Sequence, residues 1–379
     1  MNILVIGHYG IYEHLSASFV HSQAKAYVAQ GHQVRVIIPV PVGKNFQGSK
    51  LGPTFYVRQA DNMTLYYVRY LSASNLGQRH INTSSAICAI RPHLRTILHN
   101  FTPDVIHAHT LSLDSGIGHW LKKRLGCPLV VTTHGSDTFV PYTAGKFSDL
   151  RAYAQGADTV VCVSTLLRRR LEEAGVSQPM EVILNGFRVT QTPAQEKKPL
   201  SLVQAGYLVS RKKADVTMRA FARLRETYPE ATLTIVGNGP EEQRFHTLAE
   251  ELQLGNSIRF TGYLPNEQLL AEVSKARFFV MPSVREGFGI VYLEAMANGC
   301  VTIGTQGEGI ADLITSGVNG YLVPADDPDA IVSVIEACLR DPQAAESIAE
   351  QGRSDAIGLT WGKNALQYLA LFQRLRNSQ

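Results

Sequence analysis

Short apolar segments alternate with amphipathic segments along this chain of 379 residues. Residues 3–7 are apolar without polar alternation, as a parallel strand buried on both faces is. Further strands of the first half are expected at residues 34–39, 104–107, 128–133 and 159–164. Residues 18–30 and 165–174 have helical spacing instead, and Ser164 suits the N-cap of the second helix. Short strands that alternate with helices predict parallel sheets with right-handed crossovers.

The apolar pattern stops at residues 190–199, a polar, proline-containing segment, and then begins again. The second half is expected to contain strands at 200–205, 232–236, 277–281 and 301–304 and a helix at 215–228. The break predicts a linker between two domains, residues 1–190 and residues 198–360. We therefore expect an α/β protein whose two Rossmann-like, doubly wound domains face each other across a cleft, with ligands at the carboxyl ends of the strands.

The composition is typical of a soluble globular protein, because 45% of the residues are apolar and 18% are charged. There is no run of about eighteen apolar residues, and the first residues are expected to form a strand rather than a signal peptide. The five cysteines are scattered, which excludes a zinc ribbon and gives no disulfide framework. These features predict a cytoplasmic protein.

The charge is unevenly distributed between the two halves. Residues 1–190 contain 18 Lys and Arg against 10 Asp and Glu, a net charge of +8, whereas residues 191–379 contain 18 against 22, a net charge of −4. A basic half favours an anionic partner such as a membrane surface or a phosphorylated acceptor, with ordinary surface charge as the alternative. Nucleic acid is disfavoured, since the basic residues do not alternate with an aromatic platform.

One segment of the second half combines glycines with carboxylates: Glu286-Gly287-Phe288-Gly289, with Glu294 five residues later. It follows an expected strand, and residues 288–298 are expected to be helical. The glycines let backbone amides approach a ligand, and a helix N-terminus favours an anion such as a diphosphate. Glu294 can accept hydrogen bonds from a ribose diol, and Glu286 can reach a sugar. The alternative is a helix-start carboxylate at Glu286 and a solvated helix face at Glu294.

Two other loops follow expected strands and carry polar side chains. His134 follows the strand at 128–133 and can face the cleft, although a histidine bonded to the backbone is the alternative. The same two possibilities apply to His107 and His109, which follow another strand. Arg211 and Lys212 follow the strand at 200–205, where cations can hold a diphosphate leaving group unless the loop is simply solvated. No histidine pair has metal-binding helical spacing, which leaves little support for a metal site.

With these features in place, the sequence resembles the GT4 family of glycosyltransferases. Glu286 and Glu294, with seven residues between them and Gly-Phe-Gly inside, match the signature of that family. Further segments match in the same order: residues 133–137, 185–186, 236–240, 260–263, 309–314 and 319–324, and Trp361. The resemblance covers nearly the whole chain and implies a retaining glycosyltransferase with the GT-B fold and no bound metal or other cofactor.

The resemblance also implies a ligand for each of the two domains. The carboxy-terminal domain would hold a nucleotide sugar and the amino-terminal domain the acceptor, while a last helix at about residues 363–376 would pack back on the first domain. Glu286, His134 and Lys212 would be catalytic, and Glu294 would bind the ribose. The other implied site residues are Gly287, Phe288, Gly289, Arg211 and Tyr207 near the sugar and diphosphate, Arg259 and Phe260 near the base, and Tyr9 and Gly10 on the acceptor side.

Two positions depart from the family pattern. Tyr207 stands where the family usually has arginine, and Lys213 stands where it has glycine. Either Arg211 supplies the missing cation or the affinity for diphosphate is lower. Two other functions stay open: a nucleotide-sugar 2-epimerase of the same fold, and a catalytically silent protein that binds glycans or membranes.

The expected reaction moves a hexose-type sugar, from a UDP-sugar rather than a GDP-sugar, to a hydroxyl of a glycan or lipid-linked glycan, as in bacterial polysaccharide biosynthesis. Residues 41–100 are rich in Tyr, Ser and Asn, which can hydrogen-bond a glycan. The basic first half makes a polyprenyl-linked glycan a candidate acceptor and predicts peripheral contact with an anionic inner membrane face.

Overall fold

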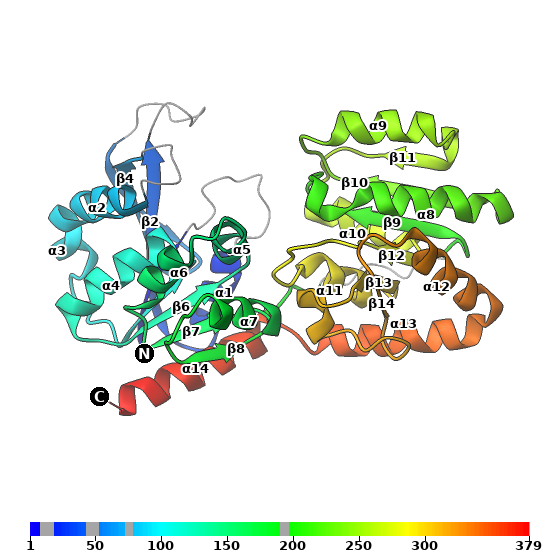
Figure 1. Ribbon diagram of the computed structural model, residues 1–379. Coiled ribbons are helices and arrows are strands. Elements are labelled where there is room, and N and C mark those ends of the chain that lie inside the picture. The colour runs from blue at the N-terminus through cyan, green and yellow to red at the C-terminus, as the bar shows by residue number, and fades with distance from the viewer. Residues whose placement is uncertain (8–18, 43–52, 73–78, 190–196, 379) are drawn as a thin grey trace. The chain divides into compact units, whose positions relative to one another are not determined.

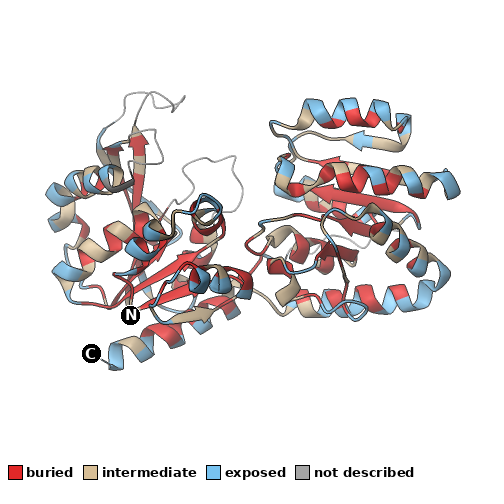
Figure 2. Cartoon of the chain, in the orientation of Figure 1, coloured by how far each residue is buried: buried red, intermediate tan, exposed pale blue. Residues whose placement is uncertain are grey.

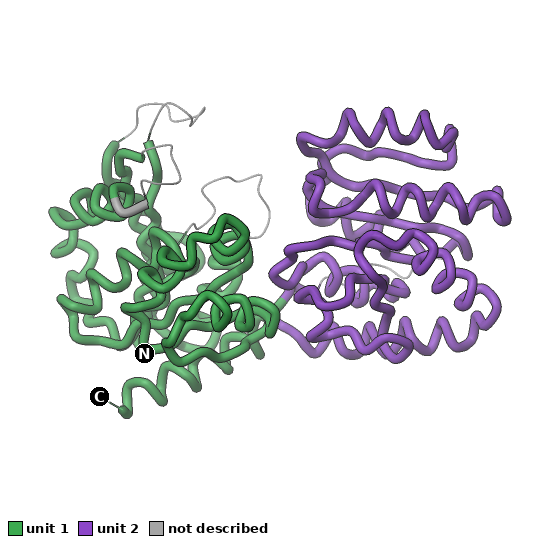
Figure 3. The backbone as a smooth tube through the Cα atoms, viewed as in Figure 1, with its two compact units in different colours: residues 1–186, 361–379 green, residues 187–360 purple. Residues whose placement is uncertain are grey.

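The structure, a computed structural model, describes residues 1–7, 19–42, 53–72, 79–189 and 197–378. The chain divides into two compact units (Figure 3). Unit 1 comprises Met1–Gly186 and Trp361–Gln379, and unit 2 comprises Phe187–Thr360. The last helix therefore belongs to the first unit, and most of the predicted linker lies outside the described residues.

The described part of unit 1 contains an eight-stranded sheet with the order β3-β4-β2-β1-β5-β6-β7-β8 (Figure 1). Its neighbouring strands are parallel except for the antiparallel pair β3 and β4. The strands are β1 (Asn2–Ile6), β2 (Gln33–Val42), β3 (Phe55–Ala60), β4 (Met63–Leu71), β5 (Val105–His109), β6 (Leu129–Thr133), β7 (Thr159–Cys162) and β8 (Met180–Val182). The helices are α1 (Phe19–Ala29), α2 (Arg79–Ile90), α3 (Leu94–Ile97), α4 (Leu113–Leu125), α5 (Ser136–Thr143), α6 (Phe147–Ala154), α7 (Thr165–Glu173) and α14 (Trp361–Asn377).

The described part of unit 2 contains a six-stranded, fully parallel sheet with the order β11-β10-β9-β12-β13-β14. The strands are β9 (Ser201–Ala205), β10 (Thr232–Val236), β11 (Ile258–Phe260), β12 (Phe278–Val280), β13 (Val301–Thr305) and β14 (Tyr321–Val323). The helices are α8 (Ala214–Thr227), α9 (Glu242–Glu251), α10 (Asn266–Lys275), α11 (Ile290–Ala297), α12 (Pro328–Arg340) and α13 (Pro342–Ile357). This strand order is that of a doubly wound dinucleotide-type fold.

The central strands of both sheets are buried, as Figure 2 shows. Helices cover both faces, which explains why these strands are continuous apolar runs in the sequence. In unit 1 the last helix, α14, packs on α1 and contributes Tyr368 and Phe372 to the core that contains Ile3 and Val5 of β1. No described helix is long and apolar enough to span a bilayer.

All nine expected strands are present, with ends shifted by at most three residues. Ser164 caps α7, because its hydroxyl accepts a hydrogen bond from the amide of Leu167 at 3.4 Å. The apolar pattern did not reveal β3, which is exposed at the sheet edge, or the three-residue strands β8, β11 and β14. It also missed β4, nine mostly buried residues in which tyrosines, Thr64 and Arg69 interrupt the aliphatic run. Edge strands and very short strands lack the long buried run on which the prediction relied.

Candidate functional site

The switch point of the unit 2 sheet lies between β9 and β12, which are neighbours in the sheet although two other strands separate them in sequence. Ligands of doubly wound folds bind at the carboxyl ends of the strands at such a point. The loops that follow β9 and β12 carry most of the predicted donor-site residues. A hydrogen bond of 2.8 Å from the amide of Val284 to the carbonyl of Arg211 joins the two loops.

The two loops bring together one carboxylate and two cations. The Nζ atom of Lys212 lies 2.5 Å from Oε2 of Glu286, and Nη1 of Arg211 lies 3.3 Å from the same oxygen. The side chains of Lys212 and Glu286 are only 11% and 12% exposed, whereas that of Arg211 is 41% exposed. One carboxylate against two cations leaves a net positive charge in a partly desolvated place, where an anion is favoured.

The loop that carries Glu286 is held by close backbone contacts. The amide of Glu286 donates to Oε2 of Glu308 at 2.9 Å. The amide of Gly309 donates to the carbonyl of Glu286, and a Cβ at Gly309 would lie 2.1 Å from the carbonyl oxygen of Gly287. Only glycine allows the β13 loop to approach the Glu286 loop this closely.

The helix after this loop begins at Ile290, not at Phe288 as predicted. Gly289 has φ +82°, a left-handed conformation that an α-helix does not accommodate. Residues 286–289 are therefore loop. The amides of Gly287, Phe288 and Gly289 donate no hydrogen bond to any residue that the structure describes. Free amides at a helix N-terminus, beside Arg211 and Lys212, form a favourable environment for a phosphate.

The side chains of Phe288 and Glu294 have different surroundings. The ring of Phe288 is 1% exposed, so only its backbone is available to a ligand. Glu294, the fifth residue of α11, is half-buried, and its carboxylate accepts a hydrogen bond from Nδ2 of Asn266 at 3.1 Å. Burial raises the pKa of Glu294 to about 7, against the weaker opposing effect of the Asn266 hydrogen bond. Glu294 thus retains acceptor capacity for a ligand.

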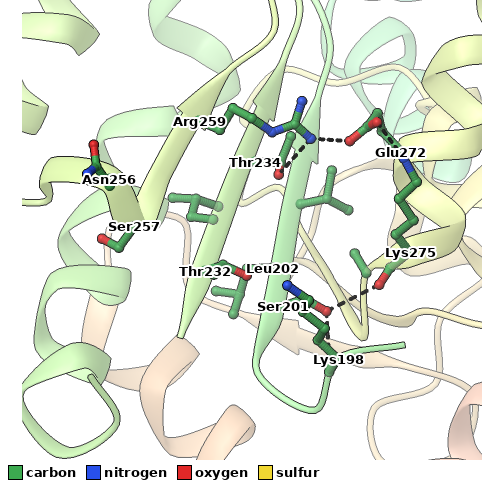
Figure 4. Close-up of a pocket in the computed structure, with 13 residues that line it drawn as sticks. Lys198, Ser201, Leu202, Thr232, Thr234, Asn256, Ser257, Arg259, Glu272 and Lys275 are labelled. Atoms are coloured by element: carbon green, nitrogen blue, oxygen red, sulfur yellow. Dashed lines mark hydrogen bonds and ion pairs between the residues drawn. The ribbon is translucent and has the colours of Figure 1, made fainter. Parts of the chain in front are cut away.

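The two residues predicted near the base do not gather with Glu294. The guanidinium of Arg259 is bound by Glu272 of α10 and by the hydroxyl of Thr234 at 3.4 Å, in a groove of about 430 Å³ on the sheet face (Figure 4). Phe260 packs against the core, with its ring centroid 4.2 Å from that of His246. Glu272 lies almost two turns along α10 from Asn266, the partner of Glu294. Roles for Arg259 and Phe260 at the base stay predictions.

The two positions that depart from the family pattern are well defined in the structure. Tyr207 follows Gly206 at the end of β9, and its side chain is 58% exposed. Lys213 has φ +52°, a conformation that glycine adopts more easily, and Nζ of Lys213 lies 2.6 Å from a carboxylate oxygen of Asp326. The family's preference for glycine at this position therefore has a backbone cause.

His134 lies in unit 1, directly after β6. Its ring stacks on Phe19 of α1 with 3.6 Å between the centroids, and its Nε2 atom lies 3.1 Å from Nδ1 of His109. Asp137 holds the loop, because its carboxylate accepts hydrogen bonds from the amides of His134, Gly135 and Leu111 at 2.8 to 3.1 Å. Burial lowers the pKa of His134 well below 6.5, so the ring is neutral at pH 7. Tyr9 and Gly10 lie outside the described residues.

Sequence reasoning assigned no role to three residues that support these sites, Asn266, Glu308 and Asp137, and for His109 it left a cleft-facing and a structural role open. Each is polar and stands at the end of a strand or at the start of a helix, which is a signal that could have found them. Their partners, however, are 22 to 28 residues away in the sequence or depend on loop geometry. No group of three or more His, Cys, Asp or Glu side chains in the described part of the chain could hold a metal ion.

Two family models match the two halves of the chain. The family named Glycosyl transferases group 1 matches residues 189–355, and Glycosyltransferase Family 4 matches residues 16–191. A GDP-mannose-dependent alpha-(1-6)-phosphatidylinositol monomannoside mannosyltransferase of Mycolicibacterium smegmatis is 30% identical in an alignment of 259 residues that covers 62% of this chain and 68% of that protein. A putative colanic acid biosynthesis glycosyltransferase of Salmonella typhimurium, WcaL, is 24% identical over 89% of this chain and 91% of its own.

Solved structures share the fold. The sucrose-phosphate synthase of Thermosynechococcus elongatus superposes with a TM-score of 0.80 at 21% identity and covers 100% of both chains. Anabaena HepE in complex with UDP superposes with a TM-score of 0.75 at 19% identity, covering 99% of this chain and 100% of that one. The chain therefore belongs to the GT4-type glycosyltransferases and has the GT-B fold.

Proposed function

We propose that this glycosyltransferase moves a hexose from a nucleotide-diphosphate sugar to a hydroxyl of a glycan or lipid-linked glycan, with retention at the anomeric carbon. One observation carries the proposal: Lys212 and Arg211 meet Glu286 at the switch point of unit 2, beside the free amides of residues 287–289. This arrangement suits a diphosphate next to a sugar. Glu294, further along α11, is the proposed partner of the ribose.

The proposed reaction keeps the donor and the acceptor on the same face of the sugar. The bond from the anomeric carbon to the diphosphate oxygen breaks, and Lys212 and the amides of residues 287–289 stabilise the charge that develops on the leaving group. The acceptor oxygen forms the new bond to the anomeric carbon, and its proton passes to a leaving phosphate oxygen. Glu286 is the proposed contact of the donor sugar, since it lies beside Lys212 and Arg211, which would hold the diphosphate attached to that sugar. His134 is the proposed contact from unit 1.

The donor nucleotide is proposed to be UDP. Anabaena HepE was solved with UDP and with UDP-glucose, and the fold of this chain matches it. The mannosyltransferase of Mycolicibacterium smegmatis is GDP-mannose-dependent, so GDP is the other nucleotide to test. Relatives include a lipopolysaccharide core glycosyltransferase of Rhizobium meliloti and the colanic acid protein WcaL, which supports a role in polysaccharide biosynthesis.

No metal ion is needed in this proposal, because Lys212 and Arg211 supply the positive charge that a cation would otherwise bring to the diphosphate. We expect sugar transfer to persist in excess EDTA. A loss of transfer that Mg²⁺ or Mn²⁺ restores would contradict this part of the proposal.

The basic first half of the chain supports a peripheral contact with anionic lipid, where a lipid-linked acceptor would be found. We expect the protein to sediment with phosphatidylglycerol vesicles at low salt and to be released by about 0.5 M NaCl, since salt screens such contacts. Equal binding to neutral phosphatidylcholine vesicles would argue against this contact.

The function is tested by incubating the protein with UDP- and GDP-hexoses, glycan acceptors and a lipid-linked oligosaccharide, and by recording the anomeric configuration of the product by NMR. We expect an α-linked product from an α-linked donor and no product from Lys212→Met. Inversion of configuration would refute the retaining mechanism. Conversion of the free nucleotide sugar to its 2-epimer would indicate the epimerase instead, and nucleotide binding without any reaction would indicate a silent binding protein.

A further inference from the structure

A pair of histidines lies at the carboxyl ends of two neighbouring strands of unit 1, β5 and β6. Nδ1 of His109 and Nε2 of His134 are 3.1 Å apart, a hydrogen-bond distance, and the two ring planes differ by 13°. His109 is 1% exposed, whereas His134 is only half-buried. His109 therefore lies behind His134, on the side that faces the protein core.

Both rings are neutral. Burial lowers the pKa of His109 to about 3 and the pKa of His134 well below its usual value. A hydrogen bond between two neutral imidazoles contains one proton, so one nitrogen donates and the other accepts. The direction of this hydrogen bond also fixes which outer nitrogen is protonated, since each neutral ring has one N–H and one bare nitrogen.

The outer nitrogens, Nε2 of His109 and Nδ1 of His134, are buried and have no hydrogen-bond partner among the residues that the structure describes. If His134 donated to His109, the unpaired N–H would be on His109, in the core. If His109 donates, the core keeps only an unpaired lone pair, and the unpaired N–H is on His134. Either direction leaves one buried N–H unpaired, which costs more than an under-used acceptor. On the half-buried ring of His134 a bound ligand can still accept from that N–H, whereas on His109, which is 1% exposed, nothing can.

The next histidine along β5 does not disturb this choice. Nδ1 of His107 lies 3.1 Å from the hydroxyl of Tyr27, and Nε2 lies 2.8 Å from the hydroxyl of Thr132. Both of its nitrogens are thus engaged, and neither bonds to His109. The hydrogen bond between His109 and His134 is therefore independent of the hydrogen bonds of His107.

We propose that His109 is a positioning residue that donates to Nε2 of His134 and so fixes the proton of His134 on Nδ1. His134 then presents a neutral N–H donor and has no free basic nitrogen, because Nε2 is occupied. Its role would be to donate a hydrogen bond to a sugar or phosphate oxygen, not to remove a proton from the acceptor hydroxyl. This role rests on the proposed function, whereas the proton position does not.

The proton position is tested by ¹⁵N NMR of the full-length protein with labelled histidine at pH 7, with the His134 signals assigned by their loss in His134→Gln. We expect a protonated Nδ1 and a bare Nε2 in the wild type. His109→Asn should preserve this state, because its amide nitrogen can donate from nearly the same place, and His109→Leu should let the Nε2–H form appear. His107→Asn, an equally buried change on the same strand, should leave His134 unchanged.

A wild-type His134 with its proton on Nε2, or a charged His134, would overturn the inference even if His109→Leu failed to fold. In the transfer assay with a UDP-hexose, we expect His109→Leu to lower kcat about tenfold with little change in the KM of the donor, as for one lost transition-state hydrogen bond. His109→Asn should restore kcat to within about threefold of the wild type; no rescue would contradict the positioning role. Absence of any nucleotide binding would refute the proposed function and leave the NMR result valid.

Discussion

Replacing Glu294 by Gln should stabilise the protein at alkaline pH, although it removes the proposed ribose ligand. Burial raises the pKa of Glu294 from 4.5 to about 7, so the native state binds a proton more tightly than the unfolded state does. For a carboxyl group with a raised pKa, the free energy of unfolding falls as pH rises from about 4.5 to about 7 and is then constant. The wild type therefore bears a cost above pH 7 that Glu294→Gln does not bear.

The magnitude follows from the shift in pKa. A shift from 4.5 to about 7 corresponds to about 3 kcal/mol at full effect. Because Glu294 is only half-buried, solvent screening reduces this to about 1–2 kcal/mol. For a unit of the size of unit 2, this predicts that the Tm of Glu294→Gln exceeds that of the wild type by about 2–8 °C at pH 8. Most of this difference in Tm should be absent at pH 5.

Thermal melts of the wild type, Glu294→Gln and Glu267→Gln between pH 5 and pH 8.5 provide the assay. Glu267 is a matched control, since it is exposed and lies next to Asn266 at the start of α10. Its variant should follow the wild type within about 0.5 kcal/mol at every pH. A Tm difference between Glu294→Gln and the wild type that is the same at pH 5 and pH 8, or that favours the wild type at pH 8, would refute the reasoning.

Three further substitutions test the geometry of the two units. Gly237→Ala should lower the free energy of unfolding of unit 2 by at least about 3 kcal/mol, because Gly237 has φ +130° and its Cβ would lie 2.0 Å from the carbonyl oxygen of Gly206. Gly262→Ala is the control: Gly262 has φ +67° but open space around it, so the loss measured by urea unfolding should be about 1 kcal/mol. Tyr207→Arg should tighten UDP binding about three- to tenfold in calorimetry by adding a cation at the end of β9, and unchanged affinity would show that Arg211 already suffices. Asp137→Asn should cost about 1–3 kcal/mol in urea unfolding, since one amide oxygen replaces a carboxylate that accepts three backbone hydrogen bonds, and a loss below 0.5 kcal/mol would contradict that account.

The alternation of apolar runs predicted both doubly wound sheets because their strands are buried on both faces. It predicted the switch-point loops as well, since Arg211, Lys212 and Glu286 each follow such a strand. What it could not supply is the contact of 2.5 Å between Lys212 and Glu286, which depends on β9 and β12 being neighbours in the sheet. The apolar pattern of a strand does not indicate which strands are its neighbours in the sheet.

Other differences arise from backbone conformation. The helical spacing of residues 288–298 did not reveal that Gly289 adopts a left-handed conformation, so the predicted helix began two residues early. The strand β3 was not predicted because it is exposed along most of its length. The strand β4 was not predicted because three tyrosines, Thr64 and Arg69 interrupt its aliphatic residues. Resemblance to the family placed Phe260 near the base, and that role stays a prediction; the structure adds that its partly buried ring packs against the core of unit 2. A match between motifs locates a residue in the chain without fixing the direction of its side chain.

The central claim is that the carboxyl edge of unit 2 binds a nucleoside diphosphate through Glu294 and the Lys212 loop. Calorimetric titration of UDP, GDP and ADP into the wild type, Glu294→Gln and Glu267→Gln at pH 8 tests it most directly. We expect one nucleotide to bind the wild type and Glu267→Gln equally, and to bind Glu294→Gln at least about tenfold more weakly, as for the loss of charged hydrogen bonds. Equal affinity of Glu294→Gln and the wild type, or no binding of any of the three nucleotides, would contradict the account.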